Sequence, residues 1–178
     1  MVAVVEGDLL EDLSPWGVLL HQVNCLGIAG AGVAKRVRDA FPGWYEAYRE
    51  HCGAAGDGKN LLGTTHSFRA RPDLVVCSAF CQYDISKARR VTDYDAWNAV
   101  FMKLAPEIEA ENARGANWEI RAPYGIGCGL GGGDWRVMSD MINYFFENSR
   151  TRFVLYRLPA EKRTSEAGRD LMEGGLPA

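Results

Sequence analysis

Two glycine-rich segments constrain what this chain can fold into more than any other feature. Residues 24–32 follow a short apolar run at 17–23, and residues 125–133 follow a second such run at 119–123. Behind each segment, apolar side chains recur at helical spacing. A strand, a glycine-rich turn and a helix in direct succession are typical of α/β folds. In such folds ligands bind beyond the carboxyl ends of the strands.

The rest of the chain alternates in the same way. Further strands are predicted at residues 2–6, 64–68, 74–79 and 152–158. Helices are predicted at residues 33–41, 44–52, 94–108 and 135–146, with Asp134 as a plain N-cap of the last one. Pro106 falls inside the third helical pattern, where we expect a kink or a break. The alternation predicts an α/β sandwich with helices on both faces of the sheet.

Composition favours one ordinary domain. The chain has 178 residues, of which 47% are hydrophobic and 24% charged. We expect residues 1–158 to form this domain and the polar residues 159–178 to be a tail outside it. The net charge of −3 gives no overall basic bias toward nucleic acid. The local cluster of Lys87, Arg89 and Arg90 fits a solvated loop and a binding spot equally well.

Cysteine and histidine usage predicts neither a disulfide framework nor a metal site. The odd number of cysteines contains no CxxC pair, and the histidines are widely spaced. We therefore expect a reducing compartment, a cytoplasmic location and no cofactor. The chain has no apolar run of membrane-spanning length and no signal peptide pattern, so no membrane partner is expected.

The glycine-rich segments suit a phosphate-bearing ligand. Glycine lets backbone N–H groups approach a ligand closely, and a helix N-terminus adds partial positive charge. Two such segments in one small domain could hold a diphosphate from both sides. The chain contains no GxxxxGK[ST] pattern, and Cys128 lacks the nearby arginine of cysteine phosphatases, so we interpret it as a small loop residue.

Four motifs in order resemble the macrodomain superfamily: Gly7-Asp8, residues 24–32, Phe41-Pro42 and residues 123–135. The resemblance covers residues 2–158. It implies a three-layer α/β/α sandwich with a mixed central sheet. It also implies binding of ADP-ribose and, in many members, removal of ADP-ribose or of its phosphate.

The resemblance also implies roles for individual residues. Asp8, with Leu9 beside it, would accept a hydrogen bond from the adenine amino group, and Asn24 would touch the distal ribose. The residues implied to surround the diphosphate are Gly30, Ala31, Gly32 and Val33 in the first segment and Gly127, Cys128, Gly129, Leu130 and Gly131 in the second. An aromatic side chain stacking on adenine is implied without being identified.

The motifs are most similar to the branch of ADP-ribose 1″-phosphate phosphatases, through residues 21–25, 79–82, 90–94 and 129–135. This predicts hydrolysis of ADP-ribose 1″-phosphate to ADP-ribose and phosphate. His21 would protonate the leaving group or position water, and Asn24 would orient the ribose hydroxyls. His21 is equally compatible with a histidine buried in the sheet. A turn-forming residue is the alternative for Asn24, and a turn cap is the less favoured alternative for Asp8.

Two other functions remain open at the level of sequence. One is a hydrolase that removes ADP-ribose from modified protein or nucleic acid. A related branch with this activity uses a lysine and, in some members, an aspartate. The resemblance places these two positions at Gln82 and Gly131 in this sequence, and Lys87 is the lysine nearest to Gln82. The other is a reader that binds ADP-ribose or ADP-ribosylated macromolecules without turnover. A nucleotide binder outside the macrodomain superfamily is a third, weaker alternative.

Overall fold

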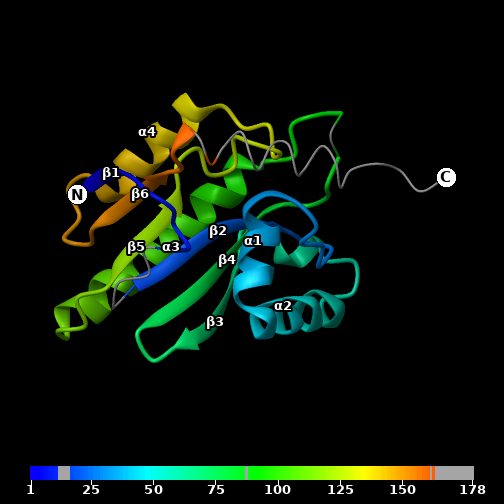
Figure 1. Ribbon diagram of the computed structural model, residues 1–178, viewed down its shortest axis with the longest axis horizontal. Helices are drawn as coiled ribbons and strands as arrows, with labels where there is room; N and C mark the ends of the chain where they lie inside the picture. The colour runs from blue at the N-terminus through cyan, green and yellow to red at the C-terminus, as the bar shows by residue number, and fades with distance from the viewer. Residues whose placement is uncertain (12–16, 87, 161, 163–178) are drawn as a thin grey trace.

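The computed structural model describes residues 1–11, 17–86, 88–160 and 162, and shows one mixed six-stranded sheet (Figure 1). The strand order is β1-β6-β5-β2-β4-β3. The strands are β1 (Val2–Glu6), β2 (Gly17–Asn24), β3 (Thr65–Arg71), β4 (Leu74–Gln82), β5 (Glu119–Pro123) and β6 (Phe153–Arg157). Only the β3–β4 pair is antiparallel within this described sheet. Lys87 and most of the predicted tail lie outside the described residues.

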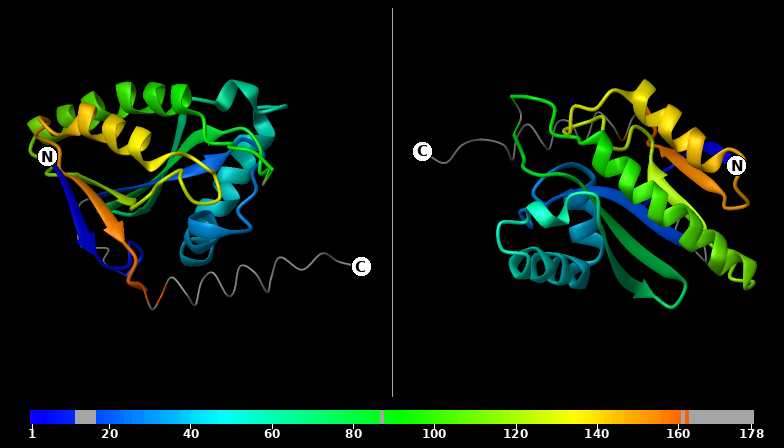
Figure 2. Two further views of the ribbon diagram at one scale, coloured as in Figure 1. Left: turned by 90° about the horizontal axis from the view of Figure 1, so that it is seen from above. Right: turned by 180° about the vertical axis from the view of Figure 1, so that it is seen from behind.

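Helices cover both faces of the sheet, which confirms the predicted three-layer α/β/α sandwich. The helices are α1 (Gly32–Ala40), α2 (Pro42–Ala54), α3 (Tyr94–Ala113) and α4 (Trp135–Phe146), with a short 3₁₀ helix η1 (Lys59–Leu61). Figure 2 shows α3 and α4 side by side, and α1 and α2 as a separate pair. Each pair contributes to its own hydrophobic core.

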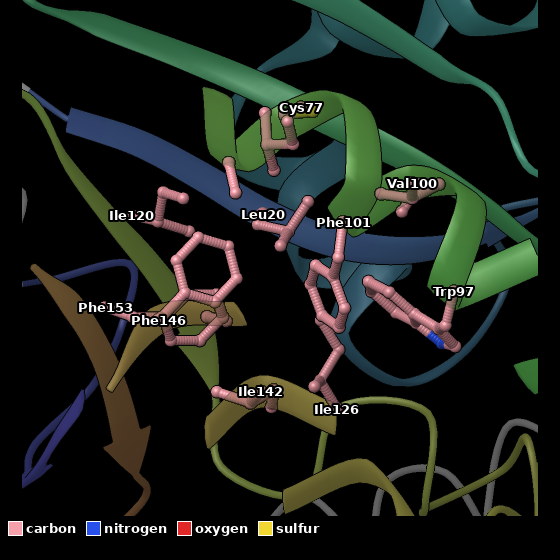
Figure 3. Packing of buried hydrophobic residues seen from close by; sticks show 14 of the residues in the cluster. Leu20, Cys77, Trp97, Val100, Phe101, Ile120, Ile126, Ile142, Phe146 and Phe153 are labelled. Atoms are coloured by element: carbon pink, nitrogen blue, oxygen red, sulfur yellow. The ribbon is translucent and has the colours of Figure 1, made fainter. Parts of the chain in front are cut away.

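Strand β2 lies in the middle of the sheet and is buried from both sides. Leu20 points toward α3 and α4, where it packs in the core with Phe101 and Phe153 (Figure 3). Leu19 and Val23 instead join the core beneath α1 and α2. Because side chains alternate along a strand, odd-numbered residues of β2 up to Val23 face the α1–α2 layer and even-numbered residues up to Gln22 face the α3–α4 layer. The register shifts between Val23 and Asn24.

Two prolines mark differences from the predicted helices. Pro42 does not simply end the first helix; it occupies the first turn of α2, where its missing N–H costs no hydrogen bond. At Pro106 the sequence predicts a kink or a break. The predicted break is wrong, since α3 continues through Pro106 without interruption. Pro106 lies on the exposed side, while Leu104, Ala105 and Ile108 hold the opposite side of the helix on the core. Burial of this apolar side outweighs one lost helical hydrogen bond.

Aspartate side chains cap the two helices of the α3–α4 layer. Asp93 accepts a hydrogen bond from Ala96 N at 2.9 Å, and Asp134 accepts one from Arg136 N at 2.8 Å. The predicted N-cap at Asp134 is therefore confirmed. Among the described residues, no helix combines the length and apolar character that crossing a membrane requires.

Candidate functional site

The two glycine-rich segments face one another across a cleft of about 460 Å³ at the carboxyl ends of the central strands. We call residues 24–32 the first loop and residues 125–133 the second loop. Strand ends contribute polar side chains to the same cleft. The lining consists of Gln22, Val23, Asn24, Ile28, Gly30, Ala31, Gly32, Val33, Ala34, Gln82, Ile85, Val91, Pro123, Tyr124, Gly125, Ile126, Gly127, Gly129, Leu130 and Gly131. The prediction that both loops share a cleft is confirmed.

The first loop offers unpaired backbone donors at the start of α1. No described residue accepts a hydrogen bond from the N–H groups of residues 30–34, all of which line the cleft. The N-cap residue, Ala31, has no side chain able to cap the helix. The first N–H groups of a helix have no partner within the helix, so this end is open to an anionic ligand.

The second loop shows the same property, because several of its carbonyl groups accept hydrogen bonds while several of its N–H groups donate none. Gly125 O accepts from Cys128 N at 2.8 Å, and Gly129 O accepts from Gly132 N at 3.0 Å. In the described part of the chain, the N–H groups of Gly127, Gly129, Leu130 and Gly131 have no acceptor. Both sides of the cleft therefore present hydrogen-bond donors.

Charged side chains are absent from the described lining of the cleft. Its polar side chains are Gln22, Asn24, Gln82 and Tyr124, and none of these carries a charge near neutral pH. No group of histidine, cysteine, aspartate and glutamate side chains that could hold a metal ion occurs in the described ranges. An anion in this cleft would be held by backbone dipoles rather than by lysine or arginine.

Asn24 lines the cleft and also shapes the first loop. Its Oδ1 accepts hydrogen bonds from Leu26 N at 3.0 Å and Ile28 N at 3.1 Å, while its Nδ2 donates to Ile28 O at 2.6 Å. The Tyr48 hydroxyl donates to Asn24 O at 2.6 Å. The side chain thus sets the turn through which the chain passes from β2 to α1, as the turn interpretation of the sequence expects.

The structure does not bring His21 into the cleft. As an odd-numbered residue of β2, it faces the α1–α2 layer, where its ring packs edge-on against Trp44 at a centroid distance of 4.9 Å. The ring is fully buried, and neither nitrogen has a hydrogen-bond partner among the described residues. Burial lowers the pKa of His21 to about 3, so the ring is neutral at pH 7.

Asp8 and Leu9 also lie outside the described lining. Both Asp8 carboxylate oxygens accept hydrogen bonds from Arg36 Nη2 of α1, at 2.7 and 2.6 Å, and Leu10 N donates to Oδ1 at 3.0 Å. Although burial opposes it, the bonds from Arg36 and Leu10 lower the pKa of Asp8 below its ordinary value. Leu9 is buried in the core beneath α1 and α2.

Cys128 is the one second-loop residue of the predicted ligand set that does not line the cleft. Its thiol donates to Ile126 O at 3.4 Å, and burial raises its pKa to about 11. A protonated thiol is a poor nucleophile, which agrees with its interpretation as a small loop residue. The other predicted loop residues, from Gly30 to Val33 and from Gly127 to Gly131, all line the cleft.

Sequence reasoning missed several lining side chains, notably Gln22, Ile85 and Tyr124. Gln22 had a signal, because it is a polar residue inside the otherwise apolar run of β2, on the opposite face from His21. Tyr124 is the aromatic side chain of the described lining; Arg157 lies 4.1 Å from its ring centroid and Trp135 packs beside it. Nothing in the spacing distinguishes Tyr124 from the other aromatic residues of the chain.

Comparison with solved structures identifies the fold. The macrodomain of Mycobacterium tuberculosis DarG superposes with a TM-score of 0.70 at 23% identity, covering 88% of this chain and 97% of that one. Thermosipho africanus DarTG in complex with ADP-ribose superposes with a TM-score of 0.69 at 21% identity, covering 91% of this chain and 42% of that one. The chain therefore has the macrodomain fold.

Curated relatives are divided between two named activities. An ADP-ribose 1″-phosphate phosphatase of Scheffersomyces stipitis is 40% identical over 70 residues, covering 36% of this chain and 40% of the relative. The ADP-ribose 1″-phosphate phosphatase of Aspergillus fumigatus is 31% identical over 121 residues, covering 67% of this chain and 52% of the relative. A DNA ADP-ribosyl transferase-DNA ADP-ribosyl glycohydrolase fusion protein of Thermosipho africanus is 27% identical over 177 residues. The match covers 91% of this chain and 43% of the relative. The chain spans about half the length of these relatives or less, and no family model matches it.

Proposed function

We propose that the cleft binds ADP-ribose, with the diphosphate between the first and second loops. The observation that carries this proposal is the set of unpaired N–H groups on both sides of one cleft, at residues 30–34 and at Gly127, Gly129, Leu130 and Gly131. A diphosphate has acceptor oxygens on both sides and no donor near neutral pH, so it matches this lining. The ADP-ribose complex of a protein with the same fold supports the same ligand.

The reaction that we propose is hydrolysis of ADP-ribose 1″-phosphate to ADP-ribose and phosphate. Water attacks the phosphorus atom, the bond from phosphorus to the ribose oxygen breaks, and that oxygen takes up a proton. Backbone N–H groups would supply positioning and electrostatic stabilisation of the phosphoryl oxygens. Two of the reported relatives carry this activity in their names. Asn24 lines the cleft and stays the residue proposed to orient the distal ribose.

A catalytic role for His21 remains a prediction from the sequence resemblance. Its place on the α1–α2 side of β2, with a neutral buried ring, gives it no contact with the described lining. The proposal therefore does not depend on His21.

A reader that binds ADP-ribose without turnover is the second candidate. The lining favours it, because the described lining residues include no aspartate, glutamate, histidine, lysine or cysteine that could act as a general acid or base. A lysine-dependent hydrolase acting on modified protein or nucleic acid finds less support. Gln82 and Gly131 occupy the positions of its lysine and aspartate, and Lys87 lies outside the described residues.

The test compares two glycine-to-glutamate variants by calorimetric titration with ADP-ribose and by phosphate release from ADP-ribose 1″-phosphate. A Cβ on Gly30 meets nothing within 4 Å, and the same holds for Gly53 at the exposed end of α2. Gly30→Glu places a carboxylate in the cleft, so we expect a loss of affinity of more than about tenfold from charge repulsion. Gly53→Glu is the matched control and should bind like the unmodified chain.

The outcomes separate the candidates. Binding with phosphate release, both lost in Gly30→Glu, supports the phosphatase. Binding without phosphate release supports the reader, unless ADP-ribose is released from modified protein or DNA. No binding of ADP-ribose would overturn the proposal. A cytoplasmic location is also proposed, because all the cysteines are free thiols in the described structure.

A further inference from the structure

A chain of side-chain hydrogen bonds runs from the core beneath α3 to the second loop. Trp97 Nε1 donates to Gln22 Oε1 at 2.8 Å, Gln22 Nε2 donates to Thr92 Oγ1 at 3.0 Å, and the Thr92 hydroxyl donates to Gly127 O at 2.6 Å. Trp97 is fully buried beside Phe101 and Ile126 (Figure 3), and Thr92 is also buried. This series of hydrogen bonds therefore begins at the buried side chain of Trp97 and ends on the backbone of the second loop.

The indole N–H of Trp97 fixes the orientation of the Gln22 amide. An indole N–H can only donate, so the Gln22 oxygen must face Trp97 and its amide nitrogen must face Thr92. The same nitrogen donates to Gln82 Oε1 at 2.6 Å, and Gln82 Nε2 donates to Asp84 O at 2.8 Å. The Thr92 hydroxyl has two acceptors within reach, Gly127 O at 2.6 Å and Gln22 Oε1 at 3.3 Å, and the shorter distance makes Gly127 O the better acceptor of its single proton.

Thr92 holds the second loop at two points. Besides its hydroxyl contact with Gly127 O, its backbone N–H donates to Gly131 O at 3.0 Å, as does the N–H of Val91. These bonds engage the carbonyl groups of Gly127 and Gly131. The N–H groups of the same stretch have no acceptor among the described residues and line the cleft.

The loop lies directly on the side chains that hold it. A Cβ on Gly131 would collide with Thr92 Oγ1 and would come within 2.7 Å of both Gln22 Nε2 and Gly127 O. At Gly127, where φ is +76°, a Cβ would come within 2.9 Å of Gln22 Oε1. A different loop conformation would therefore require the hydrogen-bonded pair to rearrange.

We propose that Gln22 and Thr92 are positioning residues, which hold the second loop in the conformation that presents its N–H groups to the diphosphate of the ligand. Thr92 acts through the loop backbone and is absent from the described lining. Gln22 lines the cleft but has its amide engaged with Trp97, Thr92 and Gln82. This inference rests on the proposed binding of ADP-ribose, and its test also has a readout in the free protein.

The experiment compares Thr92→Val, which removes the hydroxyl at nearly constant shape, with Thr92→Ser, which keeps it. Thr151→Val is the matched control, because Thr151 is also fully buried but lies beyond the other end of the sheet. Affinity is measured for ADP-ribose and for adenosine, which lacks the diphosphate. The amide NMR signals of Gly127, Gly129 and Gly131 are recorded in the free protein.

We expect Thr92→Val to weaken ADP-ribose binding about tenfold, to leave adenosine binding unchanged and to shift the three glycine signals. Thr92→Ser should restore both properties, and Thr151→Val should change neither. Unshifted glycine signals in Thr92→Val, or equal impairment in Thr92→Ser, would overturn the proposal. If Thr92→Val does not fold, Gln22→Met, which removes the amide bonded to Thr92, takes its place, and unshifted glycine signals in this variant would likewise overturn the proposal. If the unmodified chain fails to bind ADP-ribose, the proposed function fails, and the positioning role is decided by the glycine signals alone.

Discussion

Arg36 Nη2 lies 2.7 and 2.6 Å from the two carboxylate oxygens of Asp8, so the side chain expected to read adenine is bound by a residue of α1 in this structure. The ion pair fastens the segment after β1 to the first helix. Asp8 is almost fully buried, and Lys162 Nζ lies 3.5 Å from its Oδ2. The bond from Leu10 N agrees with the turn cap considered from the sequence, whereas the pairing with Arg36 was not predicted.

We predict that Asp8→Asn lowers the free energy of unfolding at pH 7 by about 1–3 kcal/mol, because a buried charge-assisted hydrogen bond is lost. The folded pKa of Asp8 is lowered from an ordinary 3.8, so its contribution is complete above that value and is lost as the pH falls through the folded pKa. Urea denaturation from pH 7 to pH 2 measures both effects. Asp39→Asn, at an exposed ion pair, is the control and should change stability by less than about 0.5 kcal/mol. Equal effects of the two variants would contradict the prediction.

His21 should make the fold sensitive to acid. Its pKa falls from an ordinary 6.5 to about 3 on burial, so between these values the unfolded chain binds a proton that the folded chain does not. Stability should then decrease as the pH falls through this window, with a contribution of about 1.4 kcal/mol per pH unit. In His21→Leu this contribution is absent, and the stability-against-pH curve between pH 6 and pH 4 should be flatter by that amount.

The same variant decides the remaining catalytic prediction for His21. From its position away from the cleft, we expect His21→Leu to bind ADP-ribose and to release phosphate at rates within about twofold of the unmodified chain, provided that the latter turns over. A loss of phosphate release with binding retained would instead support the role inferred from sequence resemblance. Calorimetric titration and phosphate release are measured at pH 7.5, where the buried ring is neutral in the folded chain.

The layers of the fold and the two loops were predictable because their signals are local. Apolar periodicity locates β2 and α4, and glycines next to a strand and a helix locate the cleft. The faces of β2 were not predictable. Alternation places His21 and Gln22 on opposite sides of the strand, but both sides of a central strand are buried beneath helices, so the sequence alone does not say which of these two side chains reaches the cleft.

Contacts between distant segments were the other missing part. The pairing of Asp8 with Arg36, and of Gln22 with Thr92, joins residues far apart in the chain. No spacing rule links such residues, because their approach depends on how α1 and the segment before α3 pack on the sheet. The predicted break at Pro106 was wrong for a related reason. Local propensity predicts a break, whereas packing against the core keeps α3 continuous.

Glycine at position 131 should be indispensable, whereas glycine at 129 should not be. A Cβ at 131 collides with Thr92 and Gln22, but a Cβ at 129 meets nothing within 4 Å. We expect Gly131→Ala to lower the free energy of unfolding by about 1–3 kcal/mol through overpacking, and Gly129→Ala to change it by less than about 1 kcal/mol. Urea denaturation of both variants checks this. A Gly131→Ala variant as stable as Gly129→Ala would show that the second loop can move away from Thr92.

The neutral lining predicts how ADP-ribose binding responds to pH and salt. The described lining holds no carboxylate, histidine, lysine or arginine side chain, and its donors include backbone N–H groups, which do not titrate. The diphosphate is fully ionised between about pH 6 and pH 8.5. Calorimetric titration should therefore give a dissociation constant that changes less than about twofold across this pH range.

Fixed dipoles at short range are screened by salt less than separated surface charges are, so raising the ionic strength from about 0.05 M to 0.5 M should weaken ADP-ribose binding by less than about threefold. A tenfold loss of affinity in either series would mean that a titrating or cationic side chain outside the described lining contacts the ligand.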